Sequence, residues 1–196
     1  MPEGEGQVVA ERERVLGPVP IPRWVLFWAI AVGGTCFDLV TKAVVFRELG
    51  EPIGRAQRVL VPDMLELHTS YNKGALWGLF GDWEHASLVF AALSVLAALA
   101  ICYYLFVRRA AHDTRLTISL ALIMAGALGN CYDRVTLGHV RDFVHFHIDA
   151  IRFDCAIFNF ADNMLVLGAV LLILLALRPE AVPGGEGPQT VSAETA

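Results

Sequence analysis

Charged residues are scarce in this 196-residue chain and are almost absent from four long segments. Asp, Glu, Lys and Arg make up 18% of the residues, whereas 56% are hydrophobic; soluble domains average about 25% charged residues. The apolar residues form four runs, each close to the roughly 20 residues that cross a bilayer: Trp24–Phe46, Ala86–Val107, Leu116–Asp133 and Phe158–Leu177. The second run contains no charge and lacks the polar stripe of a helix that covers a soluble core. These absences argue against a soluble protein and predict an all-α bundle of four transmembrane helices.

Cysteines are also few, and their positions argue against a disulfide or metal framework. Three of the four fall inside the apolar runs, and Cys155 lies in a loop. Their spacing matches neither a zinc motif nor a redox pair. All four are therefore interpreted as ordinary small apolar residues.

A cleavable signal peptide is not expected either. The first apolar run begins only at Trp24 and is longer than the 7–15 residues of a signal-peptide core. Residues 1–23 and 179–196 are rich in Gly, Pro and Glu, a composition typical of disorder. We therefore expect a disordered arm, an integral membrane domain over residues 24–178 and a disordered tail.

The orientation in the membrane follows from arginine positions rather than from net charge. Lysines and arginines divide equally between the two predicted sides, but Arg108, Arg109 and Arg115 crowd one eight-residue connection. The positive-inside rule weighs such short loops most. We expect a multi-pass protein with both termini in the cytoplasm and the long loops on the extracytoplasmic face.

The first long loop, residues 47–84, has a composition that favours β-structure. Two short stretches in it, residues 59–62 and 64–69, alternate partly and are rich in β-formers. They predict a small extracytoplasmic β-sheet layer that lies on the membrane surface.

Two aspartates in different apolar runs are predicted to reach the same membrane surface. Asp133 lies roughly 25 Å along the third helix from Leu116, and Asp162 lies about one turn into the fourth helix. An ionised carboxylate near hydrocarbon costs several kcal/mol, so the pair needs an explanation beyond folding. Two carboxyl groups that share one proton are the machinery of an aspartic protease. We predict Asp133 and Asp162 as a catalytic dyad that needs no metal or other cofactor.

Further polar residues are expected at the same rim. Asp38 and Lys42 lie at i and i+4 on the first helix and can pair. Asn72 lies just before the second helix. By helical phase, Asn130 precedes Asp133 by three residues and Asn159 precedes Asp162 by three. Each aspartate is thus predicted to have an amide beside it.

Two other interpretations stay open at this point. Intramembrane aspartates also serve proton-coupled transporters, although these lie at a rim rather than the midplane and no inverted repeat is visible. In the second outer loop, an alternating His-Phe-His segment is compatible with a metal site, but no ligand set has convincing spacing, and we interpret this segment as a solvated loop. The residues concerned are His139, His145, His147, Asp142, Asp149 and Asp154.

Ordered sequence blocks resemble the signatures of one family, lipoprotein signal peptidase, also called signal peptidase II. The blocks are Asp38-Leu39-Val40-Thr41-Lys42, Asn72-Lys73-Gly74-Ala75, Gly126-Ala127-Leu128-Gly129-Asn130 running to Asp133-Arg134, and Phe158-Asn159-Phe160-Ala161-Asp162. Val140-Arg141-Asp142-Phe143 also resembles the family's Val-x-Asp-Phe element. The sequence departs from the family at Leu39, where Gln is usual, and at Leu76-Trp77, where Ala-Phe is frequent.

The resemblance implies a bacterial membrane aspartic endopeptidase. Such an enzyme removes the signal peptide from diacylglyceryl-modified prolipoproteins by cutting before the lipidated cysteine. By the same resemblance Asp133 and Asp162 are the dyad, and eight positions contribute to substrate binding or active-site support: Asp38, Lys42, Asn72, Gly74, Asn130, Arg134, Asn159 and Ala161. The expected partners are prolipoproteins and membrane lipids but no nucleic acid, and the expected oligomeric state is a monomer.

Overall fold

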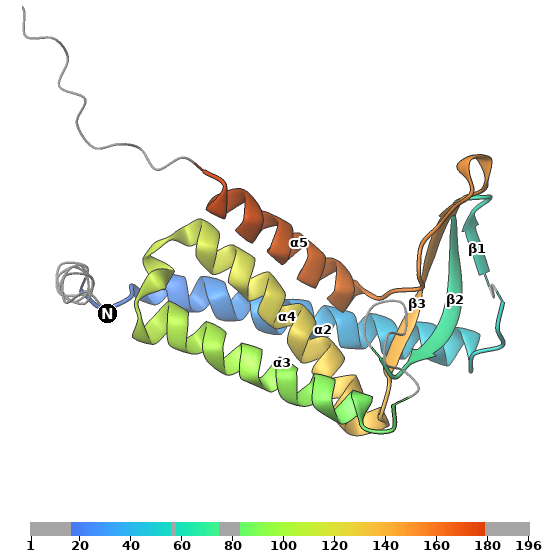
Figure 1. Ribbon diagram of the computed structural model, residues 1–196, viewed down its shortest axis with the longest axis horizontal. Helices are drawn as coiled ribbons and strands as arrows, with labels where there is room; N and C mark the ends of the chain where they lie inside the picture. Colours follow the sequence, from blue (N-terminus) through green and yellow to red (C-terminus); the bar gives the residue numbers. More distant parts are fainter. Residues whose placement is uncertain (1–16, 56–57, 75–82, 179–196) are drawn as a thin grey trace, which may run out of the picture.

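Four helices run side by side and an antiparallel sheet covers one end of them, as the computed structural model shows (Figure 1). The structure describes residues 17–55, 58–74 and 83–178. The helices are α2 (Ile21–Leu49), α3 (Ala86–Cys102), α4 (Thr114–Leu137) and α5 (Phe160–Ala176). Residues 1–16 of the predicted disordered arm, and the whole predicted tail at residues 179–196, lie outside the described part, so their disorder stays a prediction. The end of the predicted arm, Ile21 to Arg23, instead forms the first turn of α2.

The lengths of the helices suit a membrane. In the described part, α2, α4 and the helical segment Ala86–Val107, which joins α3 to a π-helical turn, are long and apolar enough to cross a bilayer. The helix α5 is apolar but has 17 residues, which rise about 26 Å against a hydrocarbon core of roughly 30 Å. The predicted architecture, a helical membrane protein with a small sheet, is confirmed.

Helix α4 is the centre of the bundle, because α2, α3 and α5 all pack against it (Figure 1). Most of its buried residues are small, among them Ala121, Ala125, Gly126 and Gly129. Small residues let neighbouring backbones approach closely in a membrane. The other helices instead expose large apolar side chains along their outer faces, as expected for helices that contact lipid.

The sheet has the strand order β1-β2-β3-β4 and is antiparallel throughout. Its strands are β1 (Arg58–Val61), β2 (Leu65–Asn72), β3 (Val140–Ile148) and β4 (Phe153–Asp154). Strands β1 and β2 correspond to the two predicted stretches. The interpretation of the second outer loop as a solvated loop was wrong, because its residues Val140–Ile148 form β3 and pair with β2. That partner lies about 70 residues upstream, so local sequence patterns do not reveal the pairing.

The start of α5 is tied to the sheet by backbone hydrogen bonds. The amides of Phe143 and Val144 both donate to the carbonyl of Phe158, at 3.0 and 2.8 Å. The amide of Phe158 donates back to the carbonyl of Val144 at 2.9 Å. This bridge holds strand β3 directly beside the first turn of α5, and so brings Asp142 and Asp162 into one region.

Candidate active site

Asp162 is held at the first turn of α5 by two asparagines. Asn159 caps the helix. Its side-chain oxygen accepts from the backbone N–H of Asp162 at 3.0 Å, and its backbone N–H donates to Asp162 Oδ2 at 3.2 Å. This reciprocal capping box satisfies two helix-terminal donors. The other carboxylate oxygen, Oδ1, accepts from Asn130 Nδ2 of α4 at 2.8 Å. The orientation of Asp162 is therefore set by both helices.

Asp133 lies in the same cluster, but its partners are positively charged side chains. It is fully buried, and Arg141 Nη2 donates to its Oδ1 at 2.7 Å while the Arg141 amide donates to Oδ2 at 3.1 Å. Lys42 Nζ is 3.5 Å from the same Oδ2. The predicted amide neighbour, Asn130, donates to Asp162 instead. Asp133 is thus a charge-compensated carboxylate between two cations.

A third aspartate, Asp142 of β3, is linked to Asp162 through Asn159. Asn159 Nδ2 donates to Asp142 Oδ1 at 2.5 Å, and Asn72 Nδ2 donates to Oδ2 at 3.1 Å. Asp142 is only 2% exposed. Burial first, and then the negative charge of Asp162, raise the pKa of Asp142 to about 7, although the two amide hydrogen bonds lower it. Its hydrogen-bond partners are neutral, unlike those of Asp133.

The Asp38–Lys42 pair adjoins this carboxylate cluster, because Lys42 also contacts Asp133 and Asn130. Lys42 Nζ contacts Asp38 Oδ2 at 2.7 Å and donates to Asn130 Oδ1 at 2.9 Å, and both charged side chains are fully buried. Asp38 Oδ1 accepts from the amide of Ala161 at 2.8 Å, where the positive end of the α5 dipole favours a carboxylate. The predicted i, i+4 pair is present, and it fixes Asn130 and the start of α5.

Gly74 and Arg134 tether the chain that follows β2. The Gly74 amide donates to Asn72 Oδ1 at 3.0 Å, and Arg134 Nη2 donates to the Gly74 carbonyl at 2.9 Å. The Arg134 guanidinium also lies over the Phe90 ring, 5.3 Å from its centroid. The adjoining residues 75–82, which include the unusual Leu76-Trp77, lie outside the described part of the chain.

All ten predicted site residues therefore belong to one cluster at the junction of bundle and sheet. Two members were not predicted for the site, Asp142 and Arg141. The sequence did contain a signal for them in Val140-Arg141-Asp142-Phe143, but reading the segment as a loop separated it from the aspartates.

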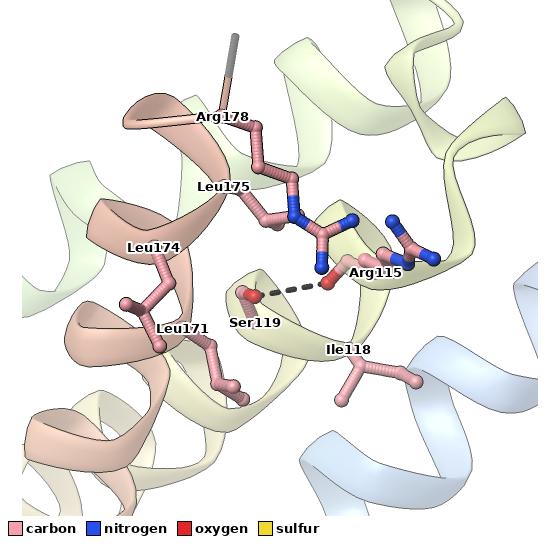
Figure 2. A pocket seen from close by; sticks show the side chains of 7 residues that line it. All are labelled: Arg115, Ile118, Ser119, Leu171, Leu174, Leu175 and Arg178. Atoms are coloured by element: carbon pink, nitrogen blue, oxygen red, sulfur yellow. Dashed lines mark hydrogen bonds between the residues drawn. The ribbon is translucent and has the colours of Figure 1, made fainter.

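A cavity at the far end of the bundle is separate from this cluster. It has a volume of about 200 Å³ and lies between the beginning of α4 and the end of α5 (Figure 2). Its walls include Leu171, Leu174 and Leu175, and the side chains of Arg115 and Arg178 lie next to each other at its edge (Figure 2). No titratable residue of the carboxylate cluster lines it.

Comparison with known proteins identifies the family. Residues 30–178, which contain the whole carboxylate cluster, match the family described as signal peptidase (SPase) II. The chain belongs to this family. A lipoprotein signal peptidase of Burkholderia mallei (strain SAVP1) is 41% identical over 145 residues, which cover 72% of this chain and 81% of the relative. The lipoprotein signal peptidase of Rhodopirellula baltica is 32% identical over 196 residues, covering 94% of this chain and 86% of the relative.

Two solved structures resemble this signal peptidase II family member. Both are described as bacterial membrane enzymes studied by the in meso method, at 2.3 and 1.9 Å resolution. The first has a TM-score of 0.68 and 29% identity, and covers 83% of this chain and 94% of that chain. The second has a TM-score of 0.65 and 31% identity, with coverages of 78% and 92%. Nothing in these comparisons supports the transporter interpretation.

Proposed function

We propose that this protein is a lipoprotein signal peptidase with an aspartic mechanism, and that Asp142 and Asp162 are its two catalytic carboxyl groups. The observation that carries the proposal is the bridge that Asn159 makes between these two aspartates. The family and the names of the relatives support the peptidase activity.

The surroundings of Asp142 suit a group that exchanges a proton. A catalytic acid or base works best when its pKa lies near the working pH, and the pKa of Asp142 is raised to about 7. Asp133, the partner predicted from the sequence, is instead engaged by Arg141 and Lys42. We therefore assign Asp133 a structural role, which holds Arg141 and Lys42 in place.

The proposed reaction uses one water molecule between the two carboxyl groups. One ionised carboxylate takes a proton from the water as it attacks the scissile carbonyl, while the other, protonated, donates a hydrogen bond to the carbonyl oxygen. Two nearby carboxyl groups do not both ionise readily, so one keeps a proton near neutral pH. As the C–N bond breaks, the protonated carboxyl group gives its proton to the leaving amine, and the other carboxyl group keeps the proton taken from the water.

The remaining cluster residues hold these groups in position. Asn130, itself fixed by Lys42, orients Asp162, and Asn72 orients Asp142. Gly74 and Arg134 fix the chain beside Asn72, where we place the substrate peptide. Rigid support of this kind is what a reacting geometry requires.

The substrate class follows from the position of the site at the end of the bundle. A diacylglyceryl-modified prolipoprotein would place its acyl chains among the helices and its peptide at the level of the dyad. Each buried acyl CH₂ group contributes roughly 0.8 kcal/mol, which makes the lipid part of recognition. We place the protein in the bacterial cytoplasmic membrane as a monomer, with both termini in the cytoplasm and the site on the extracytoplasmic face.

The test compares three aspartate variants on a diacylglyceryl-modified prolipoprotein, with the cut located by mass spectrometry. We expect Asp142→Asn and Asp162→Asn to lose at least about 100-fold in cleavage rate, because an amide cannot carry the proton. Asp133→Asn should keep cleaving in its folded fraction. Asp63→Asn, at an exposed turn with φ 58° that asparagine tolerates, is the matched control.

Two outcomes would contradict this assignment. Near-normal cleavage by Asp142→Asn, together with loss in folded Asp133→Asn, would restore Asp133 as the partner of Asp162. Equal cleavage of the same peptide with and without its diacylglyceryl group would overturn the proposed substrate placement, whichever aspartates are catalytic.

A further inference from the structure

One face of the sheet carries a group of side chains that the peptidase reaction does not use. Glu66 is paired across the strands with His145. His68 follows Glu66 by two residues, and His147 follows His145 by two residues. Side chains two residues apart lie on the same face of a strand. Leu65, Leu67 and Val144 line a cavity against α2, so alternation along β2 places Glu66 on the opposite face, away from the bundle.

The ligand atoms of these residues are close enough to share one ion. One ligand atom each from Glu66, His68 and His145 lie within 4.8 Å of one another. His145 Nδ1 is 2.7 Å from Glu66 Oε1, and His147 Nε2 is 3.9 Å from Glu66 Oε2. Ligands about 2.0–2.1 Å from a tetrahedral zinc ion are about 3.4 Å apart. The ligand atoms of Glu66, His68 and His145 are therefore close to the separation that a shared ion requires.

Outer carboxylates orient two of the histidines. His145 Nε2 is 2.7 Å from Asp154 Oδ1, and His147 Nδ1 is 2.8 Å from Asp149 Oδ1. In both rings the second nitrogen is the one on the Glu66 side. Histidines that bind metals almost always donate their other ring N–H to a carboxylate, carbonyl or water, which fixes the tautomer and the ring orientation. Two such arrangements that converge on one carboxylate point to a metal rather than to separate hydrogen bonds.

A bulge in β2 adds the third histidine. The register between β2 and β3 shifts between Leu67 and Ser70, so His68 lies in the bulged segment. Bulges redirect side chains and recur beside functional sites. The His68 ring centroid is 6.0 Å from that of His145, with the rings at 79°, which brings a further imidazole to the cluster.

We propose that Glu66, His68 and His145 bind one Zn²⁺ ion per chain, with Asp154 as the carboxylate that orients His145 and His147 beside the site. Two imidazoles and one carboxylate are a ligand set that zinc accepts, with water in the fourth position. The ion joins β2 to β3, the strand that carries Asp142, and so stiffens the sheet beside the active site. It takes no part in peptide cleavage.

The test uses the full chain, purified without a polyhistidine tag, stripped with chelator and then titrated with Zn²⁺ alone. We expect about one tightly held ion per chain by equilibrium dialysis and elemental analysis. His145→Ala and Glu66→Gln should each weaken binding at least 10-fold, and Asp154→Asn, which changes only an orienting group, should weaken it 10- to 100-fold. His85→Ala, which removes an exposed histidine outside the cluster, should bind as the wild type does.

A spectroscopic readout keeps the proposal testable if a variant folds poorly. Co²⁺ bound in place of zinc should show the intense visible absorption of tetrahedral coordination in the wild type and in His85→Ala, and lose it in His68→Ala. The proposal is overturned if the stripped wild type takes up no tightly held zinc on titration, or if His145→Ala and His85→Ala bind it equally. Neither result depends on peptidase activity.

Discussion

At the scale of single residues, three aspartates in one cluster differ by what surrounds them, and two of them, Asp133 and Asp142, are buried. Asp133 is engaged by a lysine and an arginine, and Asp142 by two neutral amides. Asp162 is held within a helix cap and by Asn130. The same side chain is thereby suited to structural charge pairing in one position and to proton exchange in another.

The pH dependence of stability should report the environment of Asp142. Its pKa is about 7 when folded and 3.8 ordinarily, so between about pH 4 and 7 the folded state keeps a proton that the unfolded chain has lost. Wild-type stability therefore falls as pH rises through this window, and Asp142→Asn, which does not titrate, escapes the loss. The melting temperature of Asp142→Asn minus that of the wild type should rise from pH 4.5 to 7.5 and level off above about pH 8. A difference that stays flat over this range would contradict the raised pKa.

Lys42 should contribute far more to stability than a cation in a surface pair. The variant Lys42→Met leaves Asp38 and Asp133 buried without their shared cation. Removing one partner of a buried ion pair lowers the free energy of unfolding by about 3–5 kcal/mol. The control is Arg47→Met, since the Arg47–Glu48 pair is exposed and such pairs contribute about 0–1 kcal/mol. Thermal unfolding in detergent measures both, and similar losses in the two variants would show that the Lys42 network is not the stabilising element.

At the scale of elements, the packing of α4 against α5 sets the depth of the site. A Cβ added at Gly126 would collide with the Ala161 carbonyl and the Leu165 side chain. One added at Gly129 would meet Asp38 Oδ2 at 2.5 Å. These two glycines let α5 approach closely enough for the Ala161 amide to reach Asp38, and so bring Asp162 beside Asn130.

Gly126→Ala should therefore separate α4 from α5 and destabilise the protein by about 1–3 kcal/mol, the usual cost of overpacking. Gly33→Ala is the matched control, because a Cβ there meets nothing within 4 Å. Alanine in an exposed helix should be neutral at Gly33, or stabilising by up to about 1 kcal/mol. Melting temperatures of the two variants, with cleavage rates beside them, decide the matter; an unchanged Gly126→Ala would mean that the helices are not held by this contact.

At the scale of the whole molecule, the two ends of the bundle carry different chemistry (Figures 1 and 2). The sheet and the buried carboxylates occupy one end. Arg115 and Arg178 lie together at the other, beside the connection that contains Arg108 and Arg109. Arginine-rich short connections favour the cytoplasm, so we propose that the sheet lies on the extracytoplasmic side.

Cysteine labelling in intact cells tests this orientation. Glu84→Cys, at the sheet end of α3, should react with a membrane-impermeant maleimide. Arg178→Cys, after α5, should react only once the membrane is permeabilised. The native cysteines set the background, which is measured in the wild type. The opposite pattern would reverse the orientation and place the carboxylates in the cytoplasm.

Much of this protein follows from the sequence alone, because the responsible forces are local. Apolar runs of membrane length predict the helices, the i, i+4 spacing predicts the Asp38–Lys42 pair, and alternation predicts β1 and β2. The residues predicted for the site do lie together. Their grouping was predicted from the rise of each helix and from the order of the sequence blocks. Both can be read from residue positions along the chain.

Only the tertiary structure decides which groups touch. Strand β3 forms because β2, distant in the chain, supplies its hydrogen-bond partners, and the alternating sequence of β3 does not by itself reveal that partner. Asn130 lies one turn from Asp133, yet its amide turns to Asp162 on another helix, while Arg141 from β3 neutralises Asp133. Burial and hydrogen-bond direction depend on neighbours far away in sequence, and these two properties distinguish Asp142 from Asp133.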